Sequence, residues 1–285
     1  MVGADKASIR WTDSGGSGRV VVFIHGWSCG LGDWDSQVRV LAAQFRCVAI
    51  DLPGHGDSQR PDRPGIDEMA SGVRAVIEHL GIHAAVLIGH SMGCRVALQT
   101  AHDLPGLIEG MVFIDGSMMQ GDPAQVIERF EGEIASSGAD ALIDRLYDGF
   151  NVATTPAEVR AALARRRADA DPGFLVPLLR YMVRWDTTRA SDMLAKTDVP
   201  VMVIQSTLLD STGTRVAIKE GETTPWTRAV RSHLPGARMV TIEGIGHFPM
   251  LEAAERTHRL ISGFVQSLPA RCRHDPASGT CQACG

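Results

Sequence analysis

Residues 84–95 read A-A-V-L-I-G-H-S-M-G-C-R, and this stretch decides the fold. The apolar run before Gly89 has the length and composition of a buried strand, and the residues after Met92 continue as a helix. Between them lies G-H-S-M-G, the G-x-S-x-G spacing of a nucleophile elbow, with Ser91 at its centre. Glycine is needed on both sides of so tight a turn because neighbouring side chains would collide. The following helix aims its free N–H groups at the same spot, where negative charge can be stabilised.

Strand-like and helix-like runs alternate along most of the chain. We expect strands at residues 8–11, 20–24, 48–52, 85–88, 111–114, 199–204 and 238–242, and helices at 34–45, 68–80, 92–104, 226–233 and 253–268. The alternation predicts a mostly parallel sheet with helices on both faces, in which reactive groups gather at the carboxyl ends of the strands. Residues 117–189 break the alternation, because they are helix-rich and hold many Met and aromatic side chains. We predict that they form a lid over the carboxyl edge of the sheet.

Composition sets the limits of the organisation. The 285 residues can form one large domain with an inserted subdomain, and 44% hydrophobic with 21% charged residues is ordinary for a globular protein. We divide the chain into a core at 1–116, a helical lid at 117–190, a second part of the core at 191–268 and a tail at 269–285. The net charge of −5 argues against nucleic acid as a partner, and the three arginines at 165–167 are interpreted as a solvated helix face. With no apolar leader and no run of membrane-spanning length, we expect no membrane partner and a cytoplasmic location.

The cysteines fall into two groups. Three are scattered through the body of the chain and are expected to be small buried residues: Cys29, Cys47 and Cys94. The tail instead holds C-x-H followed by C-x-x-C, a ligand-like spacing that could close a tetrahedral zinc site: Cys272, His274, Cys281 and Cys284. The connecting segment is short and nothing apolar nearby would support a mini-domain. A solvated tail is therefore the competing interpretation.

Four segments, each at a predicted strand end, carry a resemblance to a known family. They are F-I-H-G-W at 23–27, D-L-P-G-H-G-D-S at 51–58, the elbow, and G-I-G-H-F-P at 244–249. From about residue 8 to 268 the chain resembles an α/β-hydrolase of the esterase, lactonase and haloperoxidase-like type. The resemblance implies a mostly parallel sheet of about eight strands, with the helical lid inserted after the sixth. Nothing in the sequence implies a cofactor, or a metal in the active site.

A serine nucleophile needs a base, and the chain has ten histidines. His247 follows a late apolar strand within a glycine loop and precedes the terminal helix, so it can reach Ser91 across the carboxyl edge of the sheet. His25 and His55 lie in glycine-containing turns, where a structural role bonded to the backbone is predicted. His90 is expected to point away from Ser91. The others lie on or beside helices, as ordinary surface or satisfied histidines: His79, His83, His102, His233 and His258.

The acid that orients His247 has two candidates. The family usually draws it from the loop after the strand at 199–204, but the expected slot there is apolar and Asp210 comes slightly late. Asp115 ends the strand directly after the elbow unit, where some α/β-hydrolases place their acid. We favour Asp115 because it lies at a rigid strand end, whereas Asp210 depends on an unknown loop path. A helix cap for Asp115 and a solvated turn residue for Asp210 are the structural alternatives.

The oxyanion hole and the substrate pocket follow from the same loops. Backbone N–H groups of Met92 and Trp27 are predicted to form the hole, with Ser28 as the alternative to Trp27. The Trp27 ring is expected to line the pocket. Further Met and aromatic residues suggest an adaptable apolar pocket, although each is also a candidate core residue: Met118, Met119, Trp185, Trp226, Phe248 and Met250. We interpret the insertion at 211–224 as a hairpin near the site.

These features predict a serine hydrolase that cleaves a carboxyl ester or lactone of a small, largely apolar substrate through an acyl-enzyme. A serine in the elbow excludes haloalkane dehalogenases and epoxide hydrolases, which need an aspartate nucleophile in this fold. Two alternatives stay open: a cofactor-independent oxygenase or perhydrolase on the same scaffold, and a non-catalytic ligand receptor. The sequence indicates neither the actual substrate nor the oligomeric state.

Overall fold

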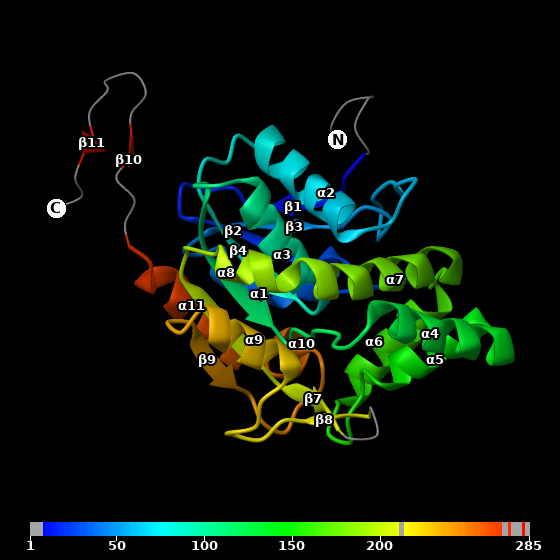
Figure 1. Cartoon of the computed structure of the whole chain (residues 1–285). Coiled ribbons are helices and arrows are strands. Elements are labelled where there is room, and N and C mark those ends of the chain that lie inside the picture. Colours follow the sequence, from blue (N-terminus) through cyan, green and yellow to red (C-terminus); the bar gives the residue numbers. More distant parts are fainter. Residues whose placement is uncertain (1–7, 211–213, 270–272, 275–280, 283–285) are drawn as a thin grey trace.

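The computed structural model describes residues 8–210 and 214–269, together with the backbone of 273–274 and 281–282. Its centre is a seven-stranded sheet of order β1-β3-β2-β4-β5-β6-β9 (Figure 1). All neighbouring strands are parallel except the edge pair β1–β3, which is antiparallel. The strands are β1 (Trp11–Asp13), β2 (Val20–Ile24), β3 (Arg46–Ile50), β4 (Ala85–His90), β5 (Ile108–Ile114), β6 (Val201–Gln205) and β9 (Arg238–Thr241).

The central strands are buried on both faces and end at a common edge. Every residue of β4 is buried, whichever face its side chain points to, because helices cover both sides of the sheet. The register pairs Ile24 of β2 with Gly89 of β4, and Ile114 of β5 with both His90 of β4 and Ile204 of β6. The loops that leave these four strands therefore start side by side, which brings together segments far apart in sequence.

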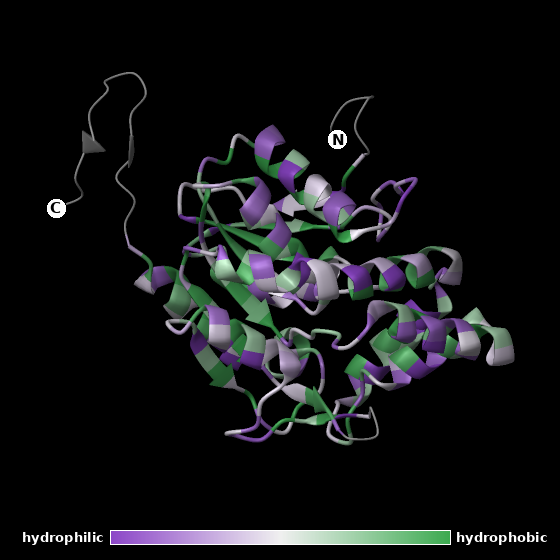
Figure 2. Ribbon diagram, viewed as in Figure 1, coloured by the Kyte–Doolittle hydropathy of each residue, from purple (hydrophilic) through white to green (hydrophobic). Residues whose placement is uncertain are grey.

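The helices of the core form two packed groups. On one side α1 packs against α10 and α11, and on the other α2, α3, α8 and α9 pack in succession. Their bounds are α1 (Asp35–Leu41), α2 (Ile66–His79), α3 (Met92–Asp103), α8 (Ala190–Ala195), α9 (Pro225–His233), α10 (Pro249–Glu252) and α11 (Ala254–Ser267), with a 3₁₀ turn η1 (Leu31–Trp34) before α1. Figure 2 shows that hydrophobic residues concentrate in the strands between these groups. None of the described helices combines the length and apolarity needed to cross a membrane.

Five helices connect β5 to β6, and the first four precede the core helix α8: α4 (Pro123–Ser137), α5 (Ala139–Asp148), α6 (Ala157–Ala168) and α7 (Pro172–Thr188). Both α4 and α7 begin with Pro after an aspartate whose side chain accepts a backbone N–H, a strong helix start. The four helices lie together at one end of the molecule, and α7 contacts α2 of the core (Figure 1). We call them the helical segment.

The sheet has seven strands, close to the predicted count of about eight. The helical segment follows the fifth strand of the chain rather than the sixth, because the described residues before Val20 form only one strand. That strand also starts later than expected, at Trp11. Ser8 and Arg10 instead bond the loop at 51–59, where their carbonyls accept the N–H groups of Gln59 and Asp51.

The segment after β6 forms a separate two-stranded hairpin, β7 (Thr207–Leu209) and β8 (Arg215–Ala217). It differs from the hairpin interpreted for the insertion at 211–224, because β7 precedes the insertion and only β8 lies within it. The body cysteines are free and buried, as predicted: Cys29, Cys47 and Cys94. The tail zinc hypothesis lies outside the described residues, because Cys272 and Cys284 are not described and only the backbone of His274 and Cys281 is. Within the described part of the chain, no cluster of three or more His, Cys, Asp or Glu side chains could hold a metal ion.

Candidate active site

Ser91 lies in a strained turn between β4 and α3. Its backbone has φ 52° and ψ −112°, a conformation that L-residues avoid, and its N–H donates to Ile114 O at 2.9 Å across the sheet. A Cβ on Gly89 would come within 2.3 Å of Gly93 O, and one on Gly93 within 2.3 Å of Ile24 O. The glycines on both sides of the serine are therefore required by close backbone contact, as the G-x-S-x-G spacing predicted.

The Ser91 side chain is partly exposed, and within the described residues its hydroxyl has no hydrogen-bond partner. Catalytic hydrogen bonds often tighten only when substrate is bound. A methyl group placed on Gly26 would lie 3.2 Å from Cβ of Ser91, so the loop after β2 runs directly beside the serine. Ser91 is thus accessible, and it is flanked by the loop expected to complete an oxyanion hole.

The loop that carries His247 is held from several sides. Glu252 accepts the N–H groups of Gly246 at 2.8 Å and Phe248 at 3.0 Å, and Ser206 donates its hydroxyl to Gly246 O at 2.7 Å. His90, the residue before Ser91, donates Nε2–H to the carbonyl of His247 at 2.8 Å. These bonds fix the backbone of the loop, and the His247 ring lies 4.7 Å from the His90 ring.

Asp115 and His247 form a buried hydrogen-bonded pair. Asp115 Oδ2 lies 2.6 Å from His247 Nδ1, and both side chains are at most 2% exposed. Asp115 itself has φ 43°, so it is a second strained residue at a strand end. Because the carboxylate accepts from Nδ1, the neutral ring carries its proton there and leaves Nε2 as the basic nitrogen.

Three consecutive residues, from the end of β6 to the start of β7, surround the Asp115 carboxylate with hydrogen-bond donors. Its Oδ1 accepts from the backbone N–H groups of Ser206 and Thr207, both at 2.8 Å, and from the Gln205 amide at 3.0 Å. Its Oδ2 accepts from the Thr207 hydroxyl at 2.6 Å as well as from His247. The carboxylate therefore cannot rotate away from the imidazole without losing several bonds.

The charges of this pair follow from its surroundings. Burial would raise the pKa of Asp115, but the His247 hydrogen bond, the Arg215 guanidinium and the Thr207 hydroxyl together lower that pKa to about 2. Burial lowers the pKa of His247 to about 4, and the positive charge of Arg215 acts in the same direction against Asp115. At neutral pH the resting pair is an ionised aspartate beside a neutral histidine, which is the state a general base requires.

The other strand-end histidines have structural bonds, as predicted. His25 accepts the N–H of Leu52 at Nε2 (2.9 Å) and bonds Gly26 O through Nδ1. His55 bonds Pro53 O through Nδ1 and accepts the N–H of Ser28 at 3.3 Å. Burial lowers the pKa of His25 and of His90 well below the ordinary value and that of His55 to about 4, so all three are neutral at pH 7.

The bond from Ser28 to His55 bears on the oxyanion hole. Because the Ser28 N–H already has an acceptor, the N–H of Trp27 is the candidate donor on this loop. The N–H of Met92 begins α3, where the first N–H groups of a helix have no intrahelical partner. Ser28 also has a positive φ of 56°, so Ser28, Ser91 and Asp115 are the strained non-glycine residues of the described chain. All three follow strands at the same edge of the sheet, where strain often marks function.

The aromatic residues divide into those near His247 and those that pack elsewhere. The Phe248 ring lies 5.2 Å from the His247 ring, and Phe150, just after α5, stacks on His247 at 5.2 Å with 20° between the planes. Trp185 instead donates to the Gln99 side chain on α3, and Trp226 packs on Phe113 at 5.3 Å. The half-buried Met118 packs against the core. The four predicted pocket residues are therefore not one cluster.

Asp210 is placed in the β7–β8 hairpin. Its carboxylate accepts the N–H of Thr214 at 3.0 Å and its own N–H donates to Thr214 O, so it closes the turn of the hairpin. The hydrogen bond to His247 is made by Asp115. Of the two acids that the sequence left open, Asp115 is the one that the structure brings to the histidine.

Residues 21–260 match a family model described as the alpha/beta hydrolase family. The chain belongs to this family. An acetyltransferase component of the acetoin cleaving system of Pseudomonas putida is 27% identical over 266 residues, which are 90% of this chain and 66% of that protein. A non-heme chloroperoxidase of Streptomyces lividans is 30% identical over 227 residues, 72% of this chain and 79% of the relative. The solved structure of Est816, named as an N-acyl homoserine lactone degrading enzyme, superposes with a TM-score of 0.73 at 24% identity, covering 92% of this chain and 99% of that one.

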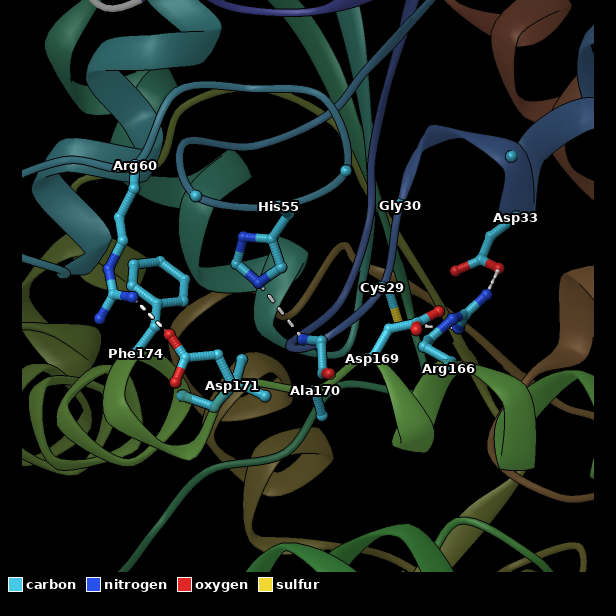
Figure 3. Close-up of a pocket in the computed structure, with 15 residues that line it drawn as sticks. Cys29, Gly30, Asp33, His55, Arg60, Arg166, Asp169, Ala170, Asp171 and Phe174 are labelled. Atoms are coloured by element: carbon cyan, nitrogen blue, oxygen red, sulfur yellow. Dashed lines mark hydrogen bonds and ion pairs between the residues drawn. The ribbon is translucent and has the colours of Figure 1, made fainter.

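In this alpha/beta hydrolase a cavity of about 350 Å³ is lined by residues 28–30 of the loop after β2, by residues 54–56 and by residues of the helical segment. Figure 3 shows Asp33 with Arg166 at one end of it, and Arg60 with Asp171 at the other. The interpretation of residues 165–167 as a solvated face is wrong for Arg166, because its guanidinium reaches the buried Asp33. The cavity is not lined by Ser91 or His247.

Sequence reasoning missed several residues of the hydrolase site. The loop after β6 lacks an acid in the expected slot, yet Gln205, Ser206 and Thr207 are a run of polar donors at a strand end, which could have signalled that they hold an acid from elsewhere. Phe150 and Arg215 reach the site from the helical segment and the hairpin, and no local pattern marks either of them.

Proposed function

We propose that this alpha/beta hydrolase cleaves a carboxyl ester or lactone of a small, largely apolar substrate through an acyl-enzyme. Ser91 is the nucleophile, His247 the general base and then acid, and Asp115 the residue that orients and stabilises the imidazolium. The observation that carries the proposal is the 2.6 Å contact between Asp115 and His247 at the sheet edge that also holds the strained Ser91. No relative's activity is needed for that argument.

The reaction follows from the placement of each group. Ser91 Oγ attacks the carbonyl carbon while its proton passes to Nε2 of His247, and the resulting oxyanion accepts hydrogen bonds from the N–H groups of Trp27 and Met92. His247 then gives the proton to the leaving alcohol, which departs and leaves the acyl group on Ser91. Water attacks that acyl group with His247 again as base, and the acid and the free serine are released.

The substrate side of the proposal rests on the helical segment. Tyr147 of α5 shares a 2.5 Å hydrogen bond with the Ser28 side chain, and Phe150 stacks on His247. The same aromatic pair lies 6.2 and 6.3 Å from the Trp27 ring. We propose that the segment acts as a lid, so that apolar rings cover both the oxyanion loop and the base. Such a cover excludes water and favours an apolar acyl or alcohol group.

The first experiment is labelling by a fluorophosphonate, which reacts with an activated serine hydroxyl. We expect stoichiometric labelling of the native protein, none of Ser91→Ala, and strongly slowed labelling of His247→Ala. Native protein that stays unlabelled would overturn the enzymatic proposal and favour a ligand receptor. A panel of nitrophenyl esters of increasing chain length, with lactones such as N-acyl homoserine lactones, then ranks the substrates; lactones are included because Est816 is named for that activity.

Perhydrolysis is a second candidate, favoured by the relative named non-heme chloroperoxidase. The same acyl-enzyme would be attacked by hydrogen peroxide in place of water, which releases a peracid and restores the Ser91 hydroxyl. Both reactions need Ser91 and His247, so mutation does not separate them. Peracid formation from an ester and hydrogen peroxide, compared with acid formation in the same sample, decides which acceptor the site favours.

A further inference from the structure

The β7–β8 hairpin brings a cationic side chain to the Asp115–His247 pair. Arg215 begins β8 and pairs with Leu209 of β7, and its side chain reaches Thr207 at the start of the hairpin. Its Nη1 donates to the Thr207 hydroxyl oxygen at 2.7 Å and lies 3.6 Å from Asp115 Oδ2. The Arg215 side chain is 14% exposed and Asp115 is fully buried, so solvent screens this interaction weakly.

Asp115 Oδ2 therefore interacts with several groups at once. The same oxygen accepts from His247 Nδ1 at 2.6 Å and from the Thr207 hydroxyl at 2.6 Å, and Thr207 in turn accepts from Arg215. Thr207 therefore links the guanidinium to the carboxylate. A permanent positive charge beside the acid reduces the net negative potential that the imidazole experiences.

Few other charges face His247. From β4 the neutral His90 bonds the His247 carbonyl, and from α10 Glu252 is engaged by the backbone N–H groups of the neighbouring residues. Asp210, on the hairpin itself, accepts from the Thr214 N–H in the turn. The helical segment contributes the uncharged Phe150 ring. Arg215 is thus the cation of the described site that faces the acid of the pair.

We propose that Arg215 is a positioning residue which shares the Asp115 carboxylate with His247 and thereby keeps His247 unprotonated, and the enzyme active, in mildly acidic solution. The proposal rests on the function proposed above for these two residues. Its physical basis is competition: when His247 takes up a proton, the imidazolium must share one carboxylate with a guanidinium, which makes protonation less favourable. The direction agrees with the lowered pKa of His247, to which the Arg215 charge contributes after burial.

The test is the pH dependence of kcat/KM for nitrophenyl acetate with the full chain, between pH 4 and 8. We expect the acidic limb of Arg215→Gln to move to higher pH by about one unit relative to the native enzyme. Arg215→Lys, which retains the positive charge, should keep most of the native profile. The matched control is Arg228→Gln on α9, which removes an exposed guanidinium that bonds Thr223 among the described residues. Arg215→Met replaces the Gln variant if that one does not fold.

A second readout does not depend on turnover. The ring protons of His247, assigned by their loss in His247→Gln, are titrated by NMR in the native protein and in Arg215→Gln. An upward shift of the His247 midpoint without any esterase activity would retain the role of Arg215 and reject the proposed hydrolysis. An active Arg215→Gln enzyme with an unmoved acidic limb and an unmoved His247 midpoint would overturn the inference. An equal shift in Arg215→Lys would overturn it as well, because charge would not be the cause.

Discussion

Two of the buried aspartates of this hydrolase, Asp115 and Asp186, each bond a basic side chain, and these partners differ in one respect. Asp115 bonds His247 at 2.6 Å, and Asp186 on α7 bonds Arg95 on α3 through two contacts of 2.7 Å. Both carboxylates are at most 1% exposed in their side chains. The guanidinium stays charged at every accessible pH, whereas the imidazole can gain or lose a proton, with a pKa that burial lowers to about 4.

Because one partner is a guanidinium and the other an imidazole, the first pair can only be structural, whereas the second can take part in proton transfer. The Asp186–Arg95 pair ties the helix that follows the elbow to the helical segment, and Asp186 also accepts the Met119 N–H at 2.8 Å. Its charges never change, so it contributes geometry alone. The Asp115–His247 pair has the same burial but a partner able to carry a proton. In the proposed reaction Asp115 would need no reorientation, because the N–H groups of Ser206 and Thr207 already hold it.

The largest effect is expected from Asp115→Asn. The amide would present N–H or C=O to His247 Nδ1 without a negative charge, which favours the wrong tautomer and leaves the imidazolium unstabilised. We expect kcat for a nitrophenyl ester to fall on the order of 10⁴-fold, by analogy with the serine protease triad. Circular dichroism should show a folded protein. A loss of less than tenfold would mean that another group orients His247.

Asp186→Asn should affect stability instead. Removing one partner of a buried ion pair leaves Arg95 charged and uncompensated, which typically costs about 3–5 kcal/mol in the free energy of unfolding. Urea denaturation at pH 7 measures it, and the folded fraction should keep kcat far closer to native than Asp115→Asn does. The double variant Arg95→Met/Asp186→Leu should recover much of the loss, because no charge remains buried. A stability equal to native in the single variant would contradict the structural role.

The pH dependence of the unfolding free energy should also distinguish the Asp115–His247 pair from the Asp186–Arg95 pair, with a smaller effect. The pKa of His247 is lowered in the folded state to about 4 from an ordinary value of 6.5, so between these values the unfolded chain binds a proton that the folded protein does not. Stability is therefore complete above pH 6.5 and declines as the pH falls toward 4, by up to about 3 kcal/mol from this residue.

The buried neutral histidines at 25, 55 and 90 contribute in the same direction. The measurement is the slope of the unfolding free energy against pH, from urea titrations at half-unit intervals. We expect His247→Gln to reduce the slope by up to one proton, while the variant Arg95→Met/Asp186→Leu leaves the slope unchanged. Identical slopes for His247→Gln and the native protein would show that His247 is not held neutral by the fold.

The smallest effect is expected from Asp210→Asn. The side chain accepts the Thr214 N–H in a hairpin turn, and the asparagine side-chain oxygen can accept the same bond, so the change should alter stability by less than about 0.5 kcal/mol. Steady-state kinetics with the nitrophenyl ester should give kcat within about twofold of native. A loss comparable with that of Asp115→Asn would make Asp210 part of the acid function.

How far the sequence predicted the site depended on the range of each interaction. The turn around Ser91 was predictable because its requirement is local: two glycines, a strand before and a helix after lie within ten residues. His247 was predictable for a similar reason, since a glycine loop between a strand and a terminal helix marks it. The identity of the acid was less predictable, because Asp115 and Asp210 both follow strands. The packing of residues 205–207 around the Asp115 carboxylate distinguishes them.

The strand count illustrates the same limit. The seven strands of the sheet correspond to the seven apolar runs that the chain displays, whereas the eighth strand was implied by resemblance alone and is not formed by the described residues. The predicted pocket residues were chosen by chemical type. Trp185 instead donates a hydrogen bond to Gln99, and Trp226 packs on Phe113, because large apolar side chains are usually buried against the nearest packed element.

The sequence by itself determined the order of strands and helices, the serine turn and the histidine loop, because each depends on backbone conformations that neighbouring residues specify. Only the tertiary structure decided which carboxylate bonds His247, that the Phe150 ring stacks on the His247 ring, and that Arg215 lies beside the Asp115 carboxylate. Those contacts join residues more than 90 positions apart, with Arg215 and His247 on separate loops of the same edge. Side-chain contacts over such distances are set by how the layers pack, and no local pattern encodes that.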